Sequence, residues 1–264
     1  RDPLRVFELD FEANLPILRM CVKHKKRLIF PSTSEVYGMC PDEEFDPDNS
    51  NLVVGPINKP RWIYSVSKQL MDRIIHAYGM KGELDYTLFR PFNWIGAGLD
   101  SLTASNPGGA RVITQFLGHI IRGEPIQLVD GGAARRSFTD VDDAIRALMT
   151  IIDNPNNIAS GKIYNIGNPS NNHSIRELAE TLLKLSSSYE EYQAGAARTK
   201  IVETSSGDYY GKGYQDVPNR TPKISNTVAE LKWQPSVTLA GALKKILEES
   251  RAEARTMLAT PPAR

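Results

Sequence analysis

Several features that would restrict function are scarce or missing in this sequence of 264 residues. It has only two cysteines, which excludes a disulfide scaffold and fits a reducing compartment, so we expect a cytoplasmic protein. No apolar run approaches the ~20 residues that cross a membrane, and we expect neither a signal peptide nor a membrane partner. Because the four histidines are scattered, we expect no metal site. The net charge of +1 gives no reason to expect nucleic acid as a partner.

Apolar segments with helical and strand-like patterns alternate along the chain. Residues 4–25 have helical periodicity, which Pro16 is expected to kink or restart. Residues 27–31 and 86–89 are short apolar strands that end in polar residues, and a helix over 63–76 lies between them. Further helices are predicted at 111–122, from Thr139 or Asp140 to 152, at 174–185 and at 239–254. Further strands are predicted at 125–129 and 162–166. This alternation predicts an α/β fold with a largely parallel sheet of the Rossmann type.

Tyr64 and Lys68 form a Tyr-x-x-x-Lys pair on the second predicted helix, downstream of Thr33-Ser34-Glu35. Residues i and i+4 lie on one helical face, so the Lys68 ammonium can sit beside the Tyr64 phenol. A nearby cation favours the phenolate and lowers its pKa from ~10 toward the working pH, where a base is most useful. One large enzyme class builds its acid/base for hydride transfer in this way. Taken alone, the pair could also be an ordinary helix pair.

The glycine-rich loop of a dinucleotide-binding fold is missing. Such folds begin with a strand, a G-x-G-x-x-G loop and a helix. Gly108-Gly109 and Gly131-Gly132 stand in the wrong context, and Gly211-Lys212-Gly213 lies late in the chain. We therefore expect a Rossmann-type sheet that lacks its N-terminal βαβ portion, about 60–90 residues long. Either the sequence is a fragment, or the protein has lost its cofactor site.

Longer runs of sequence resemble known families. Three runs resemble the extended short-chain dehydrogenase/reductase superfamily of nucleotide-sugar enzymes. They are residues 31–38 (PSTSEVYG), Tyr64-x-x-x-Lys68 and residues 90–94 (RPFNW). Residues 58–69, 130–132 and 209–217 resemble more closely the UDP-glucuronate decarboxylase domain of the bifunctional polymyxin-resistance enzyme of the ArnA type. This resemblance spans residues 3–233, and its most specific parts are Arg61-Trp62 and residues 211–217.

The resemblance implies an activity and a set of site residues. That family oxidises C4″ of UDP-glucuronate with NAD and releases CO2, leaving a UDP-4-keto-pentose, in the lipid A modification that gives polymyxin resistance. The implied catalytic residues are Thr33, Ser34, Glu35, Tyr64, Lys68 and Arg220, of which Tyr64 and Lys68 also bind the cofactor. The implied substrate contacts are Thr33, Ser34, Arg61, Asn93, Arg135, Arg136 and Tyr214. A homo-oligomer and a formyltransferase domain fused in the parent protein are implied as well.

We expect residues 1–92 to form the C-terminal part of the nucleotide-binding core. Residues 93–264 would be mainly a smaller UDP-sugar-binding region, with some elements returning to the core. Gln127, Ala133 and Ala134 stand where the family has polar or basic residues, which puts strong diphosphate binding in doubt. The alternatives are a UDP-apiose/UDP-xylose synthase, which has Cys where Ser34 stands, another nucleotide-sugar epimerase or dehydratase, and a non-catalytic remnant without an NAD site.

Overall fold

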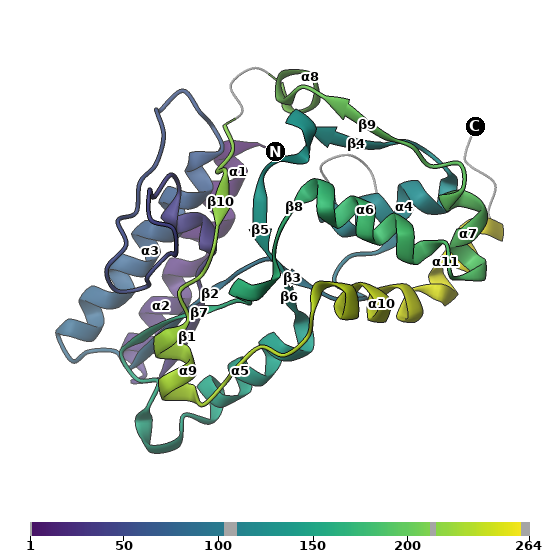
Figure 1. Cartoon of the computed structure of the whole chain (residues 1–264). Helices are drawn as coiled ribbons and strands as arrows, with labels where there is room; N and C mark the ends of the chain where they lie inside the picture. The colour runs from purple at the N-terminus through teal and green to yellow at the C-terminus, as the bar shows by residue number, and fades with distance from the viewer. Residues whose placement is uncertain (1, 103–109, 212–214, 260–264) are drawn as a thin grey trace. The chain divides into compact units, whose positions relative to one another are not determined.

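The structure is a computed structural model that describes residues 2–102, 110–211 and 215–259 (Figure 1). The chain forms two compact units. The first consists of Arg1–Trp94, Arg136–Asn172 and Gly213–Ser236, and the second of Ile95–Arg135, His173–Lys212 and Val237–Arg264. Within the described ranges, no helix combines the length and the apolar character that crossing a membrane requires.

A three-stranded parallel sheet forms the centre of the first unit. Its order is β1-β2-β7, with β1 at Leu28–Pro31, β2 at Tyr86–Pro91 and β7 at Lys162–Ile166. Leu28 lies opposite Tyr86, and Thr87 lies opposite Lys162. The middle strand β2 is buried over almost its whole length, as expected for a parallel strand that is covered on both faces. The predicted α/β fold with a largely parallel sheet is confirmed.

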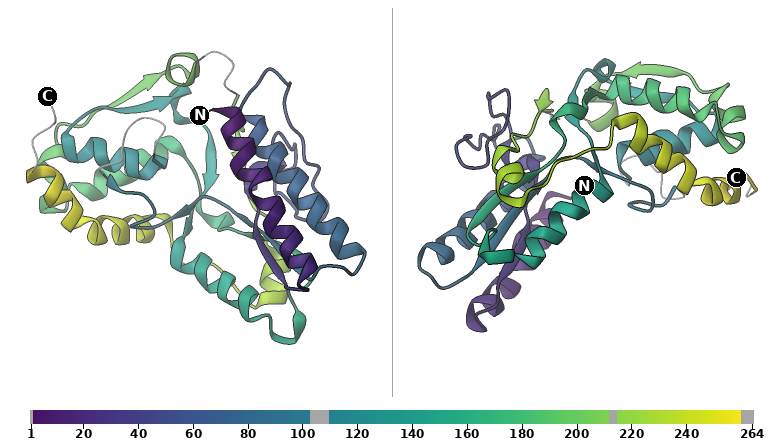
Figure 2. Two further views of the ribbon diagram at one scale, coloured as in Figure 1. Left: turned by 180° about the vertical axis from the view of Figure 1, so that it is seen from behind. Right: turned by 60° about the horizontal axis from the view of Figure 1, so that its bottom comes forward.

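Helices α2 (Asn14–Lys23) and α3 (Trp62–Met80) cover one face of this sheet, and Figure 2 shows them side by side. Met71 and Ile75 stand one turn apart on α3, so both side chains point to the same face. They pack with Leu88 of β2, and all three side chains are fully buried.

Helices α5 (Val141–Asp153) and α9 (Ser225–Leu231) pack against the opposite face. Phe89 follows Leu88 in β2 and therefore points to this side, where it joins a cluster that includes Tyr164 and Trp233. The predicted cap of α5 is confirmed for Asp140, whose side chain accepts hydrogen bonds from the first-turn amides of Asp142 and Asp143.

The N-terminal helical segment is interrupted, and the interruption lies a few residues before Pro16, where the sequence predicts a kink or a new turn. Helix α1 (Pro3–Phe7) leads into a π-helical turn, η1 (Glu8–Glu12), before α2 begins at Asn14. Pro16 is the third residue of α2. The N–H groups of the first turn have no partner within a helix, so a proline is tolerated there. A π-helical turn is rare and frequently occurs at functional sites, and this one carries Asp10.

Several short elements complete the first unit and the links to the second. Two small sheets have the orders β10-β5-β8 and β3-β6. Their strands are β3 (Trp94–Ile95), β5 (Arg135–Ser137), β6 (Thr139–Asp140), β8 (Asn172–Ser174) and β10 (Asn219–Arg220). Single 3₁₀ turns are η2 (Ser34–Tyr37), η5 (Pro155–Asn157) and η6 (Pro169–Asn171).

The second unit pairs a two-stranded parallel sheet with helices. Strand β4 (Ile126–Val129) lies beside β9 (Ile201–Thr204), with Ile126 opposite Ile201. Its helical elements are α4 (Val112–Arg122), η4 (Asp130–Gly132), α6 (Ile175–Ser186), α7 (Glu190–Ala196), α8 (Ser206–Tyr210), α10 (Leu239–Glu249) and α11 (Arg251–Ala259). The capping box of Ser174 and Glu177 is confirmed, whereas the single helix predicted over 239–254 is wrong, because it divides at Ser250. That this unit binds the UDP-sugar stays a prediction.

The long loop between η2 and α3 is fixed to the chain that follows β10. The Phe45 amide donates to the Thr221 carbonyl at 2.8 Å, and the Lys223 amide donates back to the Phe45 carbonyl at 3.0 Å. Beside this bridge, Lys223 Nζ lies 2.8 Å from the Asp46 carboxylate. Burial acts to raise the pKa of Asp46, but hydrogen bonds from Lys223 and the Asp48 amide outweigh it and lower the pKa to about 2.

We predict that Asp46→Asn reduces the dependence of stability on acid pH. Because the folded state holds the pKa of Asp46 below its unfolded value of about 4, the carboxylate stabilises the fold above that pH. This contribution is lost as the pH falls toward about 2. Urea unfolding at several pH values measures it, with Asp48→Asn, an exposed carboxylate of the same loop, as the control. If the free energy of unfolding depends on pH to the same extent in both variants, the prediction is contradicted.

Candidate active site

The segment that follows β1 brings three polar side chains to the carboxyl end of a parallel strand, where α/β proteins bind ligands. Thr33 begins the 3₁₀ turn η2, because its Oγ1 accepts a hydrogen bond from the Glu35 amide at 3.2 Å. Thr33 and Ser34 are buried, and Glu35 is partly buried. The prediction that these three residues follow the end of a strand is confirmed.

The start of α3 carries the Tyr-x-x-x-Lys pair. Tyr64 is the third residue of the helix and is partly buried, and Lys68 follows one turn later. The Lys68 ammonium is buried, donates to the Pro31 carbonyl at 3.1 Å, and lies 3.5 Å from the Asp10 carboxylate. Asp10 was not found from the sequence, because no motif marks it. It stands on the π-helical turn η1, far from Lys68 along the chain.

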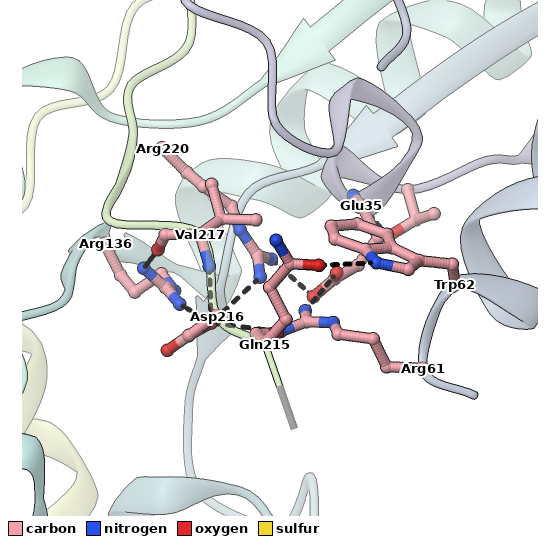
Figure 3. A network of polar contacts seen from close by, with 9 residues as sticks. Glu35, Arg61, Trp62, Arg136, Gln215, Asp216, Val217 and Arg220 are labelled. Carbon is pink, nitrogen blue, oxygen red and sulfur yellow. Dashed lines mark hydrogen bonds and ion pairs between the residues drawn. The ribbon is translucent and has the colours of Figure 1, made fainter. Parts of the chain in front are cut away.

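Glu35 lies between two guanidinium groups that come from distant parts of the chain (Figure 3). Arg61 Nη2 is 2.8 Å from Glu35 Oε2, and Arg220 Nη1 is 2.5 Å from Glu35 Oε1. Burial acts to raise the pKa of Glu35, but the charges and hydrogen bonds of Arg220 and Arg61 outweigh it, so the pKa lies below its ordinary value. Glu35 is therefore a carboxylate at neutral pH in this structure.

Asp216 is a second carboxylate among the same arginines, and Figure 3 shows three guanidiniums turned toward it. Its Oδ1 lies 2.8 Å from Arg136 Nη2, 3.2 Å from Arg61 Nη1 and 4.0 Å from Arg220 Nη2. Burial acts to raise the pKa of Asp216, and the neighbouring Arg136 and Arg220 lower it below its usual range. Asp216 is not predicted as a site residue from the sequence. It lies within the run 209–217 that carries the resemblance, but no local pattern distinguishes it.

The backbone around Asp216 is held by the same side chains. Arg61 donates to the Gln215 carbonyl, and Arg136 donates to the Val217 carbonyl at 2.8 Å. Trp62 Nε1 donates to Gln215 Oε1 at 3.0 Å. The cluster of Glu35, Arg61, Arg136, Asp216 and Arg220, which we call the arginine cluster, thus combines three guanidiniums with two carboxylates. Its excess of one positive charge suits an anionic ligand.

The remaining predicted contacts lie elsewhere. Asn93 follows β2 in a left-handed conformation with φ of 41°, and its buried Nδ2 has no hydrogen-bond partner among the described residues. Such a buried donor requires an explanation, and a bound ligand would provide one. Arg135 belongs to the second unit, where it lies 3.4 Å from Glu177. Tyr214 lies outside the described residues.

The residues at the carboxyl end of β1 fit the nicotinamide end of a dinucleotide. Lys68 Nζ donates to the Pro31 carbonyl and lies near the Asp10 carboxylate and over the Phe30 ring. A lysine ammonium carries three N–H donors, which suits contact with a ribose hydroxyl. Tyr64 adds a phenol on the same helical face. For the diphosphate, the sequence contains no G-x-G-x-x-G loop.

A family model and several solved structures match this chain. The model of the NAD dependent epimerase/dehydratase family matches residues 1–167. The crystal structure of the PbgP3 protein from Burkholderia pseudomallei is 60% identical, with a TM-score of 0.87, and the match covers 98% of this chain and 73% of that chain.

Two more distant structures show the fold. The dTDP-glucose 4,6-dehydratase from Bacillus anthracis, in complex with NAD, is 18% identical with a TM-score of 0.73, covering 93% of this chain and 68% of that chain. The UDP-glucose 4-epimerase from Thermotoga maritima, with UDP-glucose, is 21% identical with a TM-score of 0.71, covering 96% and 72%. The predicted Rossmann-type fold is confirmed. The family match covers more than half of the chain, so the chain belongs to the NAD-dependent epimerase/dehydratase family, and NAD, the cofactor predicted from the sequence, is the cofactor of that family.

Proposed function

We propose that the protein catalyses the NAD-dependent oxidative decarboxylation of UDP-glucuronate to a UDP-4-keto-pentose. The observation that supports this most is the Glu35 carboxylate between Arg61 and Arg220, directly after Thr33 and Ser34. A substrate that carries a carboxylate next to the reacting carbon needs cations at that place, whereas oxidation and epimerisation of a neutral sugar do not. Arginine suits the task because its planar guanidinium binds carboxylates through two parallel hydrogen bonds.

Oxidation at C4″ requires a base for the hydroxyl proton. Tyr64 takes this proton as its phenolate, and the Lys68 ammonium stabilises that phenolate. Pro31 and Asp10 fix the ammonium in place. NAD, when bound, supplies the acceptor for the hydride that leaves the same carbon. Thr33 and Ser34 hold the sugar through their hydroxyl groups.

The resulting β-keto acid loses CO2 because the ketone accepts the electron pair as an enolate. Arg61 and Arg220 orient the substrate carboxylate, but tight pairing would also stabilise the ground state and slow the reaction. Glu35 counters this, since it shares both guanidiniums and its own charge disfavours a second carboxylate beside it. The same repulsion favours uptake of a proton from solvent by Glu35 when the substrate carboxylate is beside it. Glu35 then donates this proton to the carbon that CO2 leaves and becomes a carboxylate again.

The experiment that tests this function is incubation of the protein with UDP-glucuronate and NAD, with UDP-glucose as the control substrate. NADH absorbance that rises together with CO2 release supports the decarboxylase. Conversion without CO2 would favour an epimerase or dehydratase. If calorimetry detects no NAD binding, this chain is the non-catalytic remnant without an NAD site.

Tyr64→Phe is expected to abolish NADH formation, because general base catalysis contributes about 10²–10⁴-fold to such steps. The rate of absorbance change at 340 nm measures it. Tyr78→Phe is the matched control, since Tyr78 stands on the same helix and packs against the core between α2 and α3. Activity of Tyr64→Phe within tenfold of the unchanged protein would rule out Tyr64 as the base.

Glu35→Gln is expected to slow CO2 release at least about 10²-fold, because the amide neither repels the substrate carboxylate nor returns a proton. Headspace CO2 from carboxyl-labelled UDP-glucuronate measures this step separately from NADH formation. Glu44→Gln, an exposed residue of the following loop, is the control. A normal rate of CO2 release would remove Glu35 from the mechanism.

A further inference from the structure

Asp72 and Arg90 form a buried ion pair in the first unit that the mechanism above does not use. Arg90 Nη2 lies 3.4 Å from Asp72 Oδ2, and the two residues are only 3% and 4% exposed. Asp72 stands on α3, one turn after Lys68, and Arg90 stands near the end of β2. Burial raises the pKa of Asp72 above its usual value, because an ionised carboxylate is disfavoured away from water.

Each partner of the pair holds one end of the segment that contains Thr33, Ser34 and Glu35. At the first end, Ser32 Oγ donates to Asp72 Oδ2 at 2.7 Å. At the other end, Arg90 Nη1 donates to the Tyr37 hydroxyl at 2.9 Å, and the guanidinium lies 4.8 Å from the centre of the Tyr37 ring. The Tyr37 hydroxyl donates in turn to Asn165 Oδ1 at 2.8 Å.

Helix α3 makes two more bonds to the same segment. Lys68 Nζ donates to the Pro31 carbonyl at 3.1 Å, and Gln69 Nε2 donates to the Val36 carbonyl at 2.8 Å. Residues 31, 32 and 36 are therefore held by side chains of one helix, while Tyr37 is held through β2. The segment is fixed at both ends and bears its reactive groups between them.

We propose that Asp72 and Arg90 are positioning residues, which fix Ser32 and Tyr37 and thereby set the orientation of Thr33, Ser34 and Glu35. The catalytic part of this inference rests on the proposed function. Stability alone does not account for the pair, because a buried ion pair can often be replaced by apolar residues without loss of stability. In addition, Asp72 Oδ1 and Arg90 Nε are buried without a hydrogen-bond partner among the described residues. Placement of the segment is the feature that an apolar pair would not supply.

Tyr37→Phe tests the inference, because it removes one hydroxyl and leaves the ion pair in place. Tyr164→Phe is the matched control. Tyr164 lies on β7, away from the segment, and is also fully buried, and its hydroxyl donates to Glu230 at 2.6 Å. Two readouts are compared. The first is hydrogen exchange of the Val36 and Gly38 amides, which bond to the Thr33 and Glu35 carbonyls. The second is kcat and KM for CO2 release.

We expect Tyr37→Phe to accelerate exchange at Val36 and Gly38 about tenfold or more and to lower kcat by about tenfold or more, with KM within about threefold. Tyr164→Phe should change none of these, although both variants lose a buried hydrogen bond. Exchange rates equal to those of the control would overturn the positioning role. Faster exchange with unchanged kcat would overturn its catalytic part.

The two proposals fail in different ways. If the unchanged protein releases no CO2, the proposed function falls, and amide exchange alone decides the positioning role. If Tyr37→Phe does not fold, Ser32→Ala cuts the bond at the other end of the segment and is expected to accelerate the same amides. Unchanged exchange in Ser32→Ala would then overturn the inference.

Discussion

The pairing of Glu35 with Arg61 and Arg220 is the interaction on which the site depends. It joins the end of β1, the start of α3 and strand β10, three segments that are far apart in the sequence. Neither arginine could stay partly or fully buried without a counter-ion, and Glu35 alone cannot neutralise both. Asp216 supplies the second negative charge, and Arg136 brings the total back to an excess of one cation. The charges of the arginine cluster are therefore interdependent, and removing any one changes the electrostatics of the others.

The sheet and the strand-end residues could be predicted from the sequence because their signals are local. The strands at residues 28–31, 86–91 and 162–166 are short apolar runs, and Thr33, Ser34 and Glu35 follow the first directly. Asp140 and the Ser174–Glu177 capping box were readable for the same reason, since a cap depends on a few neighbouring residues. Helix α7 and strand β9 were missed because their sequences are polar or partly exposed, so packing rather than periodicity decides their structure.

The partners within the site could not be predicted, because long-range pairing determines them. Nothing near Asp216 indicates that it faces Arg136, and nothing near Asp10 indicates that it faces Lys68. An exposed-looking aspartate in a polar loop is usually solvated, and only the fold reveals the cations around it. The family resemblance found Glu35 and Arg220 but could not indicate that they form an ion pair, which is the fact that determines the charge of Glu35.

The catalytic segment thus meets two kinds of electrostatic environment. On one side, Glu35 takes part in the partly solvated arginine cluster, where a ligand can exchange with or share the ion pairs and so alter the pKa of a carboxylate. On the other side, Ser32 and Tyr37 bond to the Asp72–Arg90 pair, which is buried away from solvent. A group that must change its charge during a reaction needs the first kind of environment, because a fully buried charge is too costly to form or remove. Its backbone needs the second kind, because small displacements of reacting groups cost large factors in rate. The two requirements are met at different places in the six-residue segment from Ser32 to Tyr37, the first at Glu35 in its middle and the second at its two ends. This separation explains why the fold retains a buried ion pair next to a cluster that already holds five charged groups.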